Sequence, residues 1–104
     1  MITMNDIIQM PKGNYIMKDA VYATTGETRT DRWYPEWIGM TMQLMPIHVG
    51  GVAHFRYVLD NTGYLFPGAM HTSTVVSVDI SDDEKTVKIE TMNTIYTFEK
   101  VEEE

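Results

Sequence analysis

The sequence contains no cysteine, and this absence limits both its cross-linking and its chemistry. Without cysteine there is no disulfide to hold the fold and no thiolate to act as a nucleophile or a zinc ligand. The sequence also lacks a run of 18 apolar residues, which would be needed for a membrane-spanning helix. Its first residues lack the basic start and apolar segment of a signal peptide. We therefore expect a cytoplasmic protein that does not associate with membranes.

The motifs of nucleophilic and nucleotide-dependent catalysis are missing as well. The sequence has no Gly-x-Ser-x-Gly, no phosphate-binding glycine loop and no His-Glu-x-x-His. Three histidines, His48, His54 and His71, follow one another at intervals that fit no local pattern of zinc ligands. His54 alternates with apolar residues and is expected to face solvent. We therefore expect a protein that is not an enzyme and that binds no metal or cofactor.

Basic residues are few, because eight Lys and Arg stand against fifteen Asp and Glu, for a net charge of −7. Residues 79–104 hold nine of the acidic residues and only three lysines. Direct binding to nucleic acid is disfavoured, since Lys and Arg make the phosphate contacts. A partner protein with a basic surface is favoured instead. The predicted acidic surface consists of Asp79, Asp82, Asp83, Glu84, Glu90 and Glu99.

The length of 104 residues and the hydrophobic content of 43% are typical of one small globular domain. We expect this domain to span residues 1–104, with residues 102–104 as a frayed tail. The acidic run from Asp82 to Glu84 is interpreted as a solvated turn, because it lacks the glycine and distal glutamate of a calcium-binding loop.

What the sequence has in abundance is the period-two alternation of β-strands, most clearly between Thr72 and Val101. Three strands are predicted there, with the last two joined by a turn at Met92-Asn93. We expect Asn93 to supply the positive φ that such a turn demands. The residues placed on the buried face of these strands are Val76, Val78, Ile80, Val87, Ile89, Thr91, Tyr96 and Phe98.

Further strands are predicted at Tyr15–Ala23, Ile38–Ile47 and Val52–Leu59, the last two joined by a hairpin at Gly50-Gly51. Six or seven short antiparallel strands indicate an all-β fold, either a small SH3-like barrel or a compact sandwich. A homodimer is also compatible with the pattern, because an exposed edge such as Tyr15–Ala23 or Ile95–Val101 can pair with a second copy.

The segment Thr28–Trp37 has no clean period and is expected to form the long first loop of the barrel. Pro35 restricts the preceding residue to extended geometry, which argues against a helix. The segment concentrates the residue types that dominate protein interfaces. Its candidate partner-binding residues are Arg29, Arg32, Trp33, Tyr34 and Trp37. The alternative is that Trp33 or Trp37 folds inward as a lid on the core.

Three functions are compatible with these features. The favoured hypothesis is a non-enzymatic module that binds a partner protein through the aromatic and arginine loop. The first alternative is an acidic inhibitor or regulator, of a phage or mobile-element type, which mimics nucleic acid and binds a basic nucleic-acid-handling protein. The second is a binder of a small polar ligand at a hydroxyl-rich rim. The residues of that rim are His71, Thr72, Ser73, Thr74, Thr91, Asn93 and Thr94.

Overall fold

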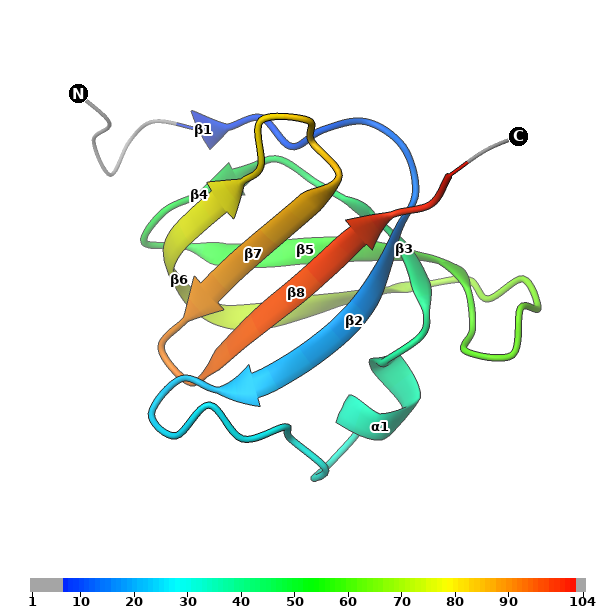
Figure 1. The fold of residues 1–104 in the computed structure, drawn as a ribbon, viewed down its shortest axis with the longest axis horizontal. Coiled ribbons are helices and arrows are strands. Elements are labelled where there is room, and N and C mark those ends of the chain that lie inside the picture. Colours follow the sequence, from blue (N-terminus) through cyan, green and yellow to red (C-terminus); the bar gives the residue numbers. More distant parts are fainter. Residues whose placement is uncertain (1–6, 103–104) are drawn as a thin grey trace.

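The computed structural model describes residues 7–102, and its main feature is a closed, six-stranded antiparallel barrel (Figure 1). Each strand pairs with the next around the barrel, and the last pairs with the first. The predicted small all-β barrel is confirmed, and its closure decides against the sandwich. The strands in their order around the barrel are β2 (Tyr15–Tyr22), β3 (Thr41–Leu44), β5 (Val52–Leu59), β6 (Ala69–Ile80), β7 (Thr86–Thr91) and β8 (Thr94–Lys100).

A separate two-stranded sheet is formed by β1 (Ile7–Ile8) and β4 (Ile47–His48). The hairpin predicted at Gly50-Gly51 is therefore only partly correct. β3 does pair with β5, with Leu44 opposite Phe55, but β4 pairs with β1. The glycine turn is present, since the amide of Gly51 donates to the carbonyl of His48 at 2.8 Å. Pro46 lies between β3 and β4, where its missing N–H cannot extend the β3 ladder.

The core fills the inside of the barrel with large apolar side chains from all six strands. Phe55 and Phe98 pack edge to face with ring centroids 4.9 Å apart, and both are fully buried. The inward faces predicted for β7 and β8 are correct, because Val87, Ile89, Thr91, Tyr96 and Phe98 are all buried. Period-two alternation therefore identifies the core wherever a strand is regular.

The inward face predicted for β6 is wrong at Val76. This side chain is 51% exposed, whereas its neighbour Val75 is 1% exposed. The register against β7 shifts between Val75 and Ser77, which is a β-bulge. One extra residue moves every following side chain to the other face, so the alternation read from Val78 and Ile80 does not extend back to Val76.

The turn between β7 and β8 is at Met92-Asn93, as predicted, but neither residue has a positive φ. Hydrogen bonds of the Thr91 side chain hold the turn in place of a positive φ. Its hydroxyl accepts hydrogen bonds from the amides of Asn93 and Thr94, at 3.3 and 3.1 Å, and donates to the carbonyl of Thr94. A buried threonine therefore holds the turn where the sequence suggested an asparagine.

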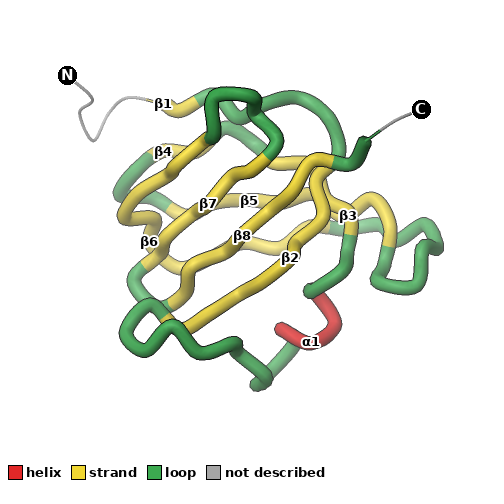
Figure 2. The backbone as a smooth tube through the Cα atoms, viewed as in Figure 1, coloured by secondary structure: helices red, strands yellow, loops and turns green. Residues whose placement is uncertain are grey.

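The long loop between β2 and β3 contains a short helix, α1 (Tyr34–Trp37), which is the only helix in the part of the chain that the structure describes (Figure 2). The prediction that Pro35 excludes a helix is wrong. Pro35 lies in the first turn, where its missing N–H would have no partner within the helix anyway. Because α1 lies beside one open end of the barrel, it brings the loop aromatics to that end (Figure 1).

The turn from β6 to β7, which holds Asp82, Asp83 and Glu84, lies at the end opposite α1 (Figure 1). Of the two edges considered for a homodimer, β8 is paired on both sides, by β7 and β2. β2 pairs with β3 only at Tyr15 and Ile16, and its other end forms hydrogen bonds with the loop that follows it. Of the predicted tail, Glu102 is exposed, and residues 103–104 lie outside the described range. Within residues 7–102, no helix has the length and apolar character needed to cross a membrane.

Candidate functional site

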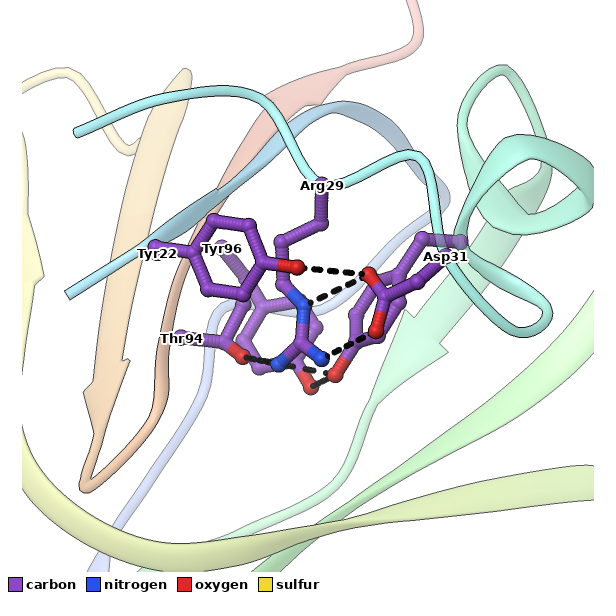
Figure 3. A network of polar contacts seen from close by, with 6 residues as sticks. Tyr22, Arg29, Asp31, Thr94 and Tyr96 are labelled. Carbon is purple, nitrogen blue, oxygen red and sulfur yellow. Dashed lines mark hydrogen bonds and ion pairs between the residues drawn. The ribbon is translucent and has the colours of Figure 1, made fainter. Parts of the chain in front are cut away.

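Arg29 organises the loop at the α1 end of the barrel (Figure 3). Its Nε and Nη2 atoms donate to the two carboxylate oxygens of Asp31, at 3.1 and 2.6 Å. Its Nη1 atom donates to the hydroxyl of Thr94 on β8, at 2.8 Å. The guanidinium carbon lies 4.5 Å from the ring centroid of Tyr22 and 4.2 Å from that of Tyr34. The arginine therefore links the loop to two strands through hydrogen bonds and cation–π contacts.

This arrangement keeps both members of the ion pair charged. The hydrogen bonds to Asp31 raise the pKa of Arg29 above its ordinary value. The same hydrogen bonds lower the pKa of Asp31 from 3.8 to about 2. The Arg29 side chain is only 11% exposed, so most of its surface is already in contact with the protein. We therefore assign Arg29 mainly to holding the loop in place.

A small cluster of buried hydroxyl groups lies under Arg29. The Tyr34 hydroxyl is 3.3 Å from both the Thr94 hydroxyl and the Tyr96 hydroxyl. Burial raises the pKa of Tyr96, so its hydroxyl stays neutral and can donate or accept. Tyr34, a predicted partner-binding residue, is therefore buried and fixes α1 to the barrel.

The remaining loop candidates are more accessible. Trp33 is 66% exposed and projects from the residue before α1. Trp37 is half-buried against the core, and its indole N–H donates to the Tyr57 hydroxyl at 3.1 Å. Arg32 is exposed and adopts a φ of 54°. The two tryptophans therefore differ. Trp33 presents its ring to solvent, where a partner can reach it, whereas Trp37 packs on the barrel as a lid on the core.

A pocket of about 1050 Å³ opens at this end of the barrel, and we call it the arginine pocket. It brings together the aromatic loop and part of the hydroxyl-rich rim, which the sequence analysis treated as separate candidates. Thr74, Thr91 and Thr94 of that rim do not line it. The lining residues are Tyr22, Thr24, Arg29, Arg32, Trp33, Tyr34, Trp37, His71, Thr72, Ser73, Met92, Asn93 and Tyr96.

A second depression of about 460 Å³ is lined by part of α1 and by the loop after β5, and we call it the aromatic groove. Trp33 and Trp37 line both depressions, whereas Arg29 and Arg32 line only the arginine pocket. The residues that line the aromatic groove are Trp33, Glu36, Trp37, Met40, Tyr57, Asp60, Asn61 and Phe66.

Next to this groove is an exposed apolar segment that the sequence analysis did not identify as a site. Tyr64, Leu65 and Phe66 lie in the loop between β5 and β6, and Leu65 is 84% exposed. The signal was three consecutive apolar residues between the turn at Asp60–Gly63 and Pro67. Such a run is equally compatible with a short buried strand, so its exposure is evident only from the structure.

The predicted acidic surface is distributed over one turn and three strands. Asp82, Asp83 and Glu84 form the exposed turn, while Asp79, Glu90 and Glu99 lie on β6, β7 and β8. Lysines interrupt this surface, because Lys88 lies opposite Asp79 in the β6–β7 register and Lys85 pairs with Glu102 at 3.4 Å. This mixture of charges does not add support to the nucleic-acid-mimic hypothesis.

The three histidines do not assemble into a centre with acidic residues. His54 and His71 lie opposite each other on β5 and β6, with ring centroids 6.1 Å apart, and both are exposed. His48 lies on β4. Among residues 7–102, no three His, Cys, Asp or Glu side chains are grouped so that they could hold a metal ion.

Comparison with protein-family models, with curated proteins and with solved structures gave no match. The two depressions at the α1 end of the barrel are therefore the features of the molecule that bear on its function.

Proposed function

We propose that this protein is a non-enzymatic interaction module that binds a segment of a partner protein in the aromatic groove. The segment would place a large apolar side chain among the rings and a lysine or arginine at the rim. The observation that carries this proposal is the composition of the groove, where Trp33, Tyr57 and Phe66 are flanked by the carboxylates of Glu36 and Asp60. Aromatic residues of this kind dominate the energy of protein interfaces.

The charge at the rim selects a basic partner. Asp60 accepts hydrogen bonds from the amide and hydroxyl of Thr62 and from the amide of Tyr64, at 2.9, 2.7 and 3.0 Å. These bonds, above all the one from the Thr62 hydroxyl, lower the pKa of Asp60, so the carboxylate is charged at neutral pH. Glu36 on α1 adds a second, exposed acid. The net charge of −7 also accelerates the approach of a basic surface.

The exposed apolar residues beside the groove enlarge the proposed contact surface. Tyr64, Leu65 and Phe66 are all exposed, as is Trp33, which lines the groove together with Phe66. Contiguous exposed apolar groups are uncommon on proteins that act alone, and they mark surfaces that a partner covers. The Lys or Arg of a bound segment can also lie over the Trp33 indole through a cation–π contact.

Selection of peptides from a random display library on the purified protein tests this proposal. We expect the selected peptides to share a lysine or arginine next to a large apolar residue. The Glu36→Lys variant should bind them about tenfold more weakly, because it replaces attraction by repulsion at the rim. Glu99→Lys, which changes an exposed acid on β8, makes the same change in net charge away from the groove and should bind nearly normally.

Two results would contradict the proposal. The first is a set of selected peptides without an enriched basic residue. The second is equal loss of binding in Glu36→Lys and Glu99→Lys, which would trace the effect to overall charge rather than to the groove. Circular dichroism of both variants checks that the barrel remains folded.

A further inference from the structure

The lining of the arginine pocket differs in its charged residue types from the molecule as a whole. Its lining includes Arg29, Arg32 and His71, and no aspartate or glutamate. The chain as a whole carries a net charge of −7. In a protein with so few basic residues, two arginines at one concave site provide a local environment that suits an anion.

The two arginines differ in how far their charges are already satisfied. Asp31 occupies one edge of the Arg29 guanidinium, and Thr94 binds its Nη1 atom. Three of the five N–H donors of Arg29 are therefore used within the protein. Arg32 forms no ion pair with any described residue, so its charge is available to a ligand.

The backbone conformation of Arg32 also indicates that its side chain binds the ligand. Its φ of 54° lies in the left-handed region, which costs free energy for a residue with a side chain and is most easily adopted by glycine. Strained residues of this kind often lie at binding sites, where the conformation directs a side chain toward its ligand. Asp31 and Trp33 flank Arg32 in a turn that the Tyr34 amide closes by donating to the Asp31 carbonyl at 3.2 Å.

The walls of the arginine pocket favour a ligand with a flat ring. Five aromatic side chains line it, three tyrosines and both tryptophans of the sequence. Ring systems stack on such walls, and a pocket of about 1050 Å³ accommodates a molecule of several rings or of a ring joined to a sugar. The Ser73 hydroxyl and the Asn93 amide also line the pocket and can bind polar substituents, whereas the buried Thr72 hydroxyl donates to the Ser73 carbonyl.

We propose that the arginine pocket binds a small molecule that combines a planar aromatic ring with an anionic group, held by Arg32 and stacked on the aromatic wall. Both an aryl carboxylate and a nucleoside monophosphate have this chemistry. The pocket and the partner groove share Trp33 and Trp37, but they can be tested separately, since Arg32 lines only the pocket and Glu36 lines only the groove.

Isothermal titration calorimetry with two matched pairs of probes tests this proposal. The first pair is 2-naphthoate and the neutral 2-naphthamide, and the second is AMP and the neutral adenosine. We expect at least one anion to bind saturably, and its neutral counterpart to bind about tenfold more weakly, because a charge-assisted hydrogen bond is lost. Comparison of the two pairs shows whether the preferred anion is a carboxylate or a phosphate. Inorganic phosphate alone should bind much more weakly, since it offers no ring.

Two matched variants locate the binding. Arg32→Gln should weaken the preferred anion about tenfold, whereas Arg56→Gln, which removes an exposed positive charge from β5, should leave it unchanged. The indole N–H resonances of the two tryptophans provide a second readout, because both rings line the pocket and should shift on binding. Glu36→Lys, which disrupts only the groove, should retain anion binding, so failure of one proposal does not imply failure of the other.

The proposal is overturned by any of three results. None of the four probes binds at millimolar concentration, or the neutral members bind as well as the anions, or Arg56→Gln weakens binding as much as Arg32→Gln. Arg32→Gly controls for the backbone, since glycine adopts the left-handed conformation without strain. It should lose the anion as Arg32→Gln does, while remaining at least as stable as the wild-type protein.

Discussion

The ion pair between Arg29 and Asp31 shows how single residues at the α1 end combine structural and binding roles. Arg29 lies between the rings of Tyr22 and Tyr34, and Asp31 fixes the orientation of its guanidinium. The loop that carries Arg32 and Trp33 continues directly from Asp31. The geometry of both proposed sites therefore depends on a carboxylate that touches neither ligand.

We expect this dependence to appear as a pH effect. The pKa of Asp31 is lowered from 3.8 in the unfolded chain to about 2 in the folded protein. The ionised carboxylate thus stabilises the fold fully above pH 3.8, and this contribution is lost as the pH falls through about 2. Asp31→Asn should lower the urea midpoint at neutral pH, and the difference from wild type should shrink as the pH falls below 3.8 and disappear below about 2, where both side chains are neutral.

Comparison of the two proteins at each pH isolates this effect. Asp60 and Asp83 also have lowered pKa values, owing to hydrogen bonds from Thr62 and Lys85, but they are present in both proteins and cancel in the difference. A difference in midpoint that stays constant down to pH 2 would contradict the role given to the Asp31 charge.

Residue types alone indicated where binding groups are concentrated, but not what each one does. The sequence identified Arg29, Arg32, Trp33, Tyr34 and Trp37 as a group, and four of its members divide into different roles. Tyr34 is buried and Arg29 nearly so, while Arg32 and Trp33 are exposed. Composition does not distinguish these outcomes, because the burial of Arg29 and Tyr34 depends on contacts with Thr94 and Tyr96 on β8, which lies far away in the sequence.

At the scale of single elements, the β6 strand shows the limit of pattern reading. The alternation on β7 and β8 gave the correct buried face, because those strands pair with each other in an unbroken register. β6 contains a bulge between Val75 and Ser77. The position of a bulge cannot be predicted from a sequence of consecutive valines and serines. The short helix α1 was missed for a related reason, since Pro35 is compatible with both a loop and a first helical turn.

Two single substitutions on β6 test the position of the bulge. Val75→Thr should destabilise the protein by about 1–3 kcal/mol, because it places a hydroxyl in the core. Val76→Thr should change stability by less than about 0.5 kcal/mol, since that side chain is exposed. Urea unfolding monitored by circular dichroism measures both values. If Val76→Thr destabilised the protein more than Val75→Thr, Val76 would be the buried residue, and the bulge between Val75 and Ser77 would be contradicted.

At the scale of the whole molecule, closure of the barrel is what creates the sites. The arginine pocket joins the loop after β2, the start of β6 and the turn between β7 and β8. These segments are distant in the sequence, so no local motif could have revealed the pocket. Closure also places the acidic β6–β7 turn at the far end (Figure 1). The strand pattern predicted a small barrel or a compact sandwich, whereas the meeting of these three segments follows only from the strand order in the structure.

The arginine pocket and the aromatic groove share one wall, and this predicts a specific result for Trp33. Its ring lines both depressions and is 66% exposed, so its removal should affect two binding activities without unfolding the barrel. Trp33→Ala should weaken both the basic peptide and the aromatic anion about tenfold, as expected for an interface aromatic. Its melting temperature should stay within roughly 2 °C of wild type.

Val76→Ala, which truncates another exposed apolar residue, is the matched control and should leave both affinities unchanged. Trp37 is unsuitable for the same purpose, because its indole donates to Tyr57 and packs on the core. A Trp33→Ala protein that loses only one of the two ligands would show that the indole is not a shared wall. Because the peptide is basic and the other ligand is anionic, an equal loss of both cannot arise from charge. Equal loss would instead show that the Trp33 ring itself contributes to both binding sites.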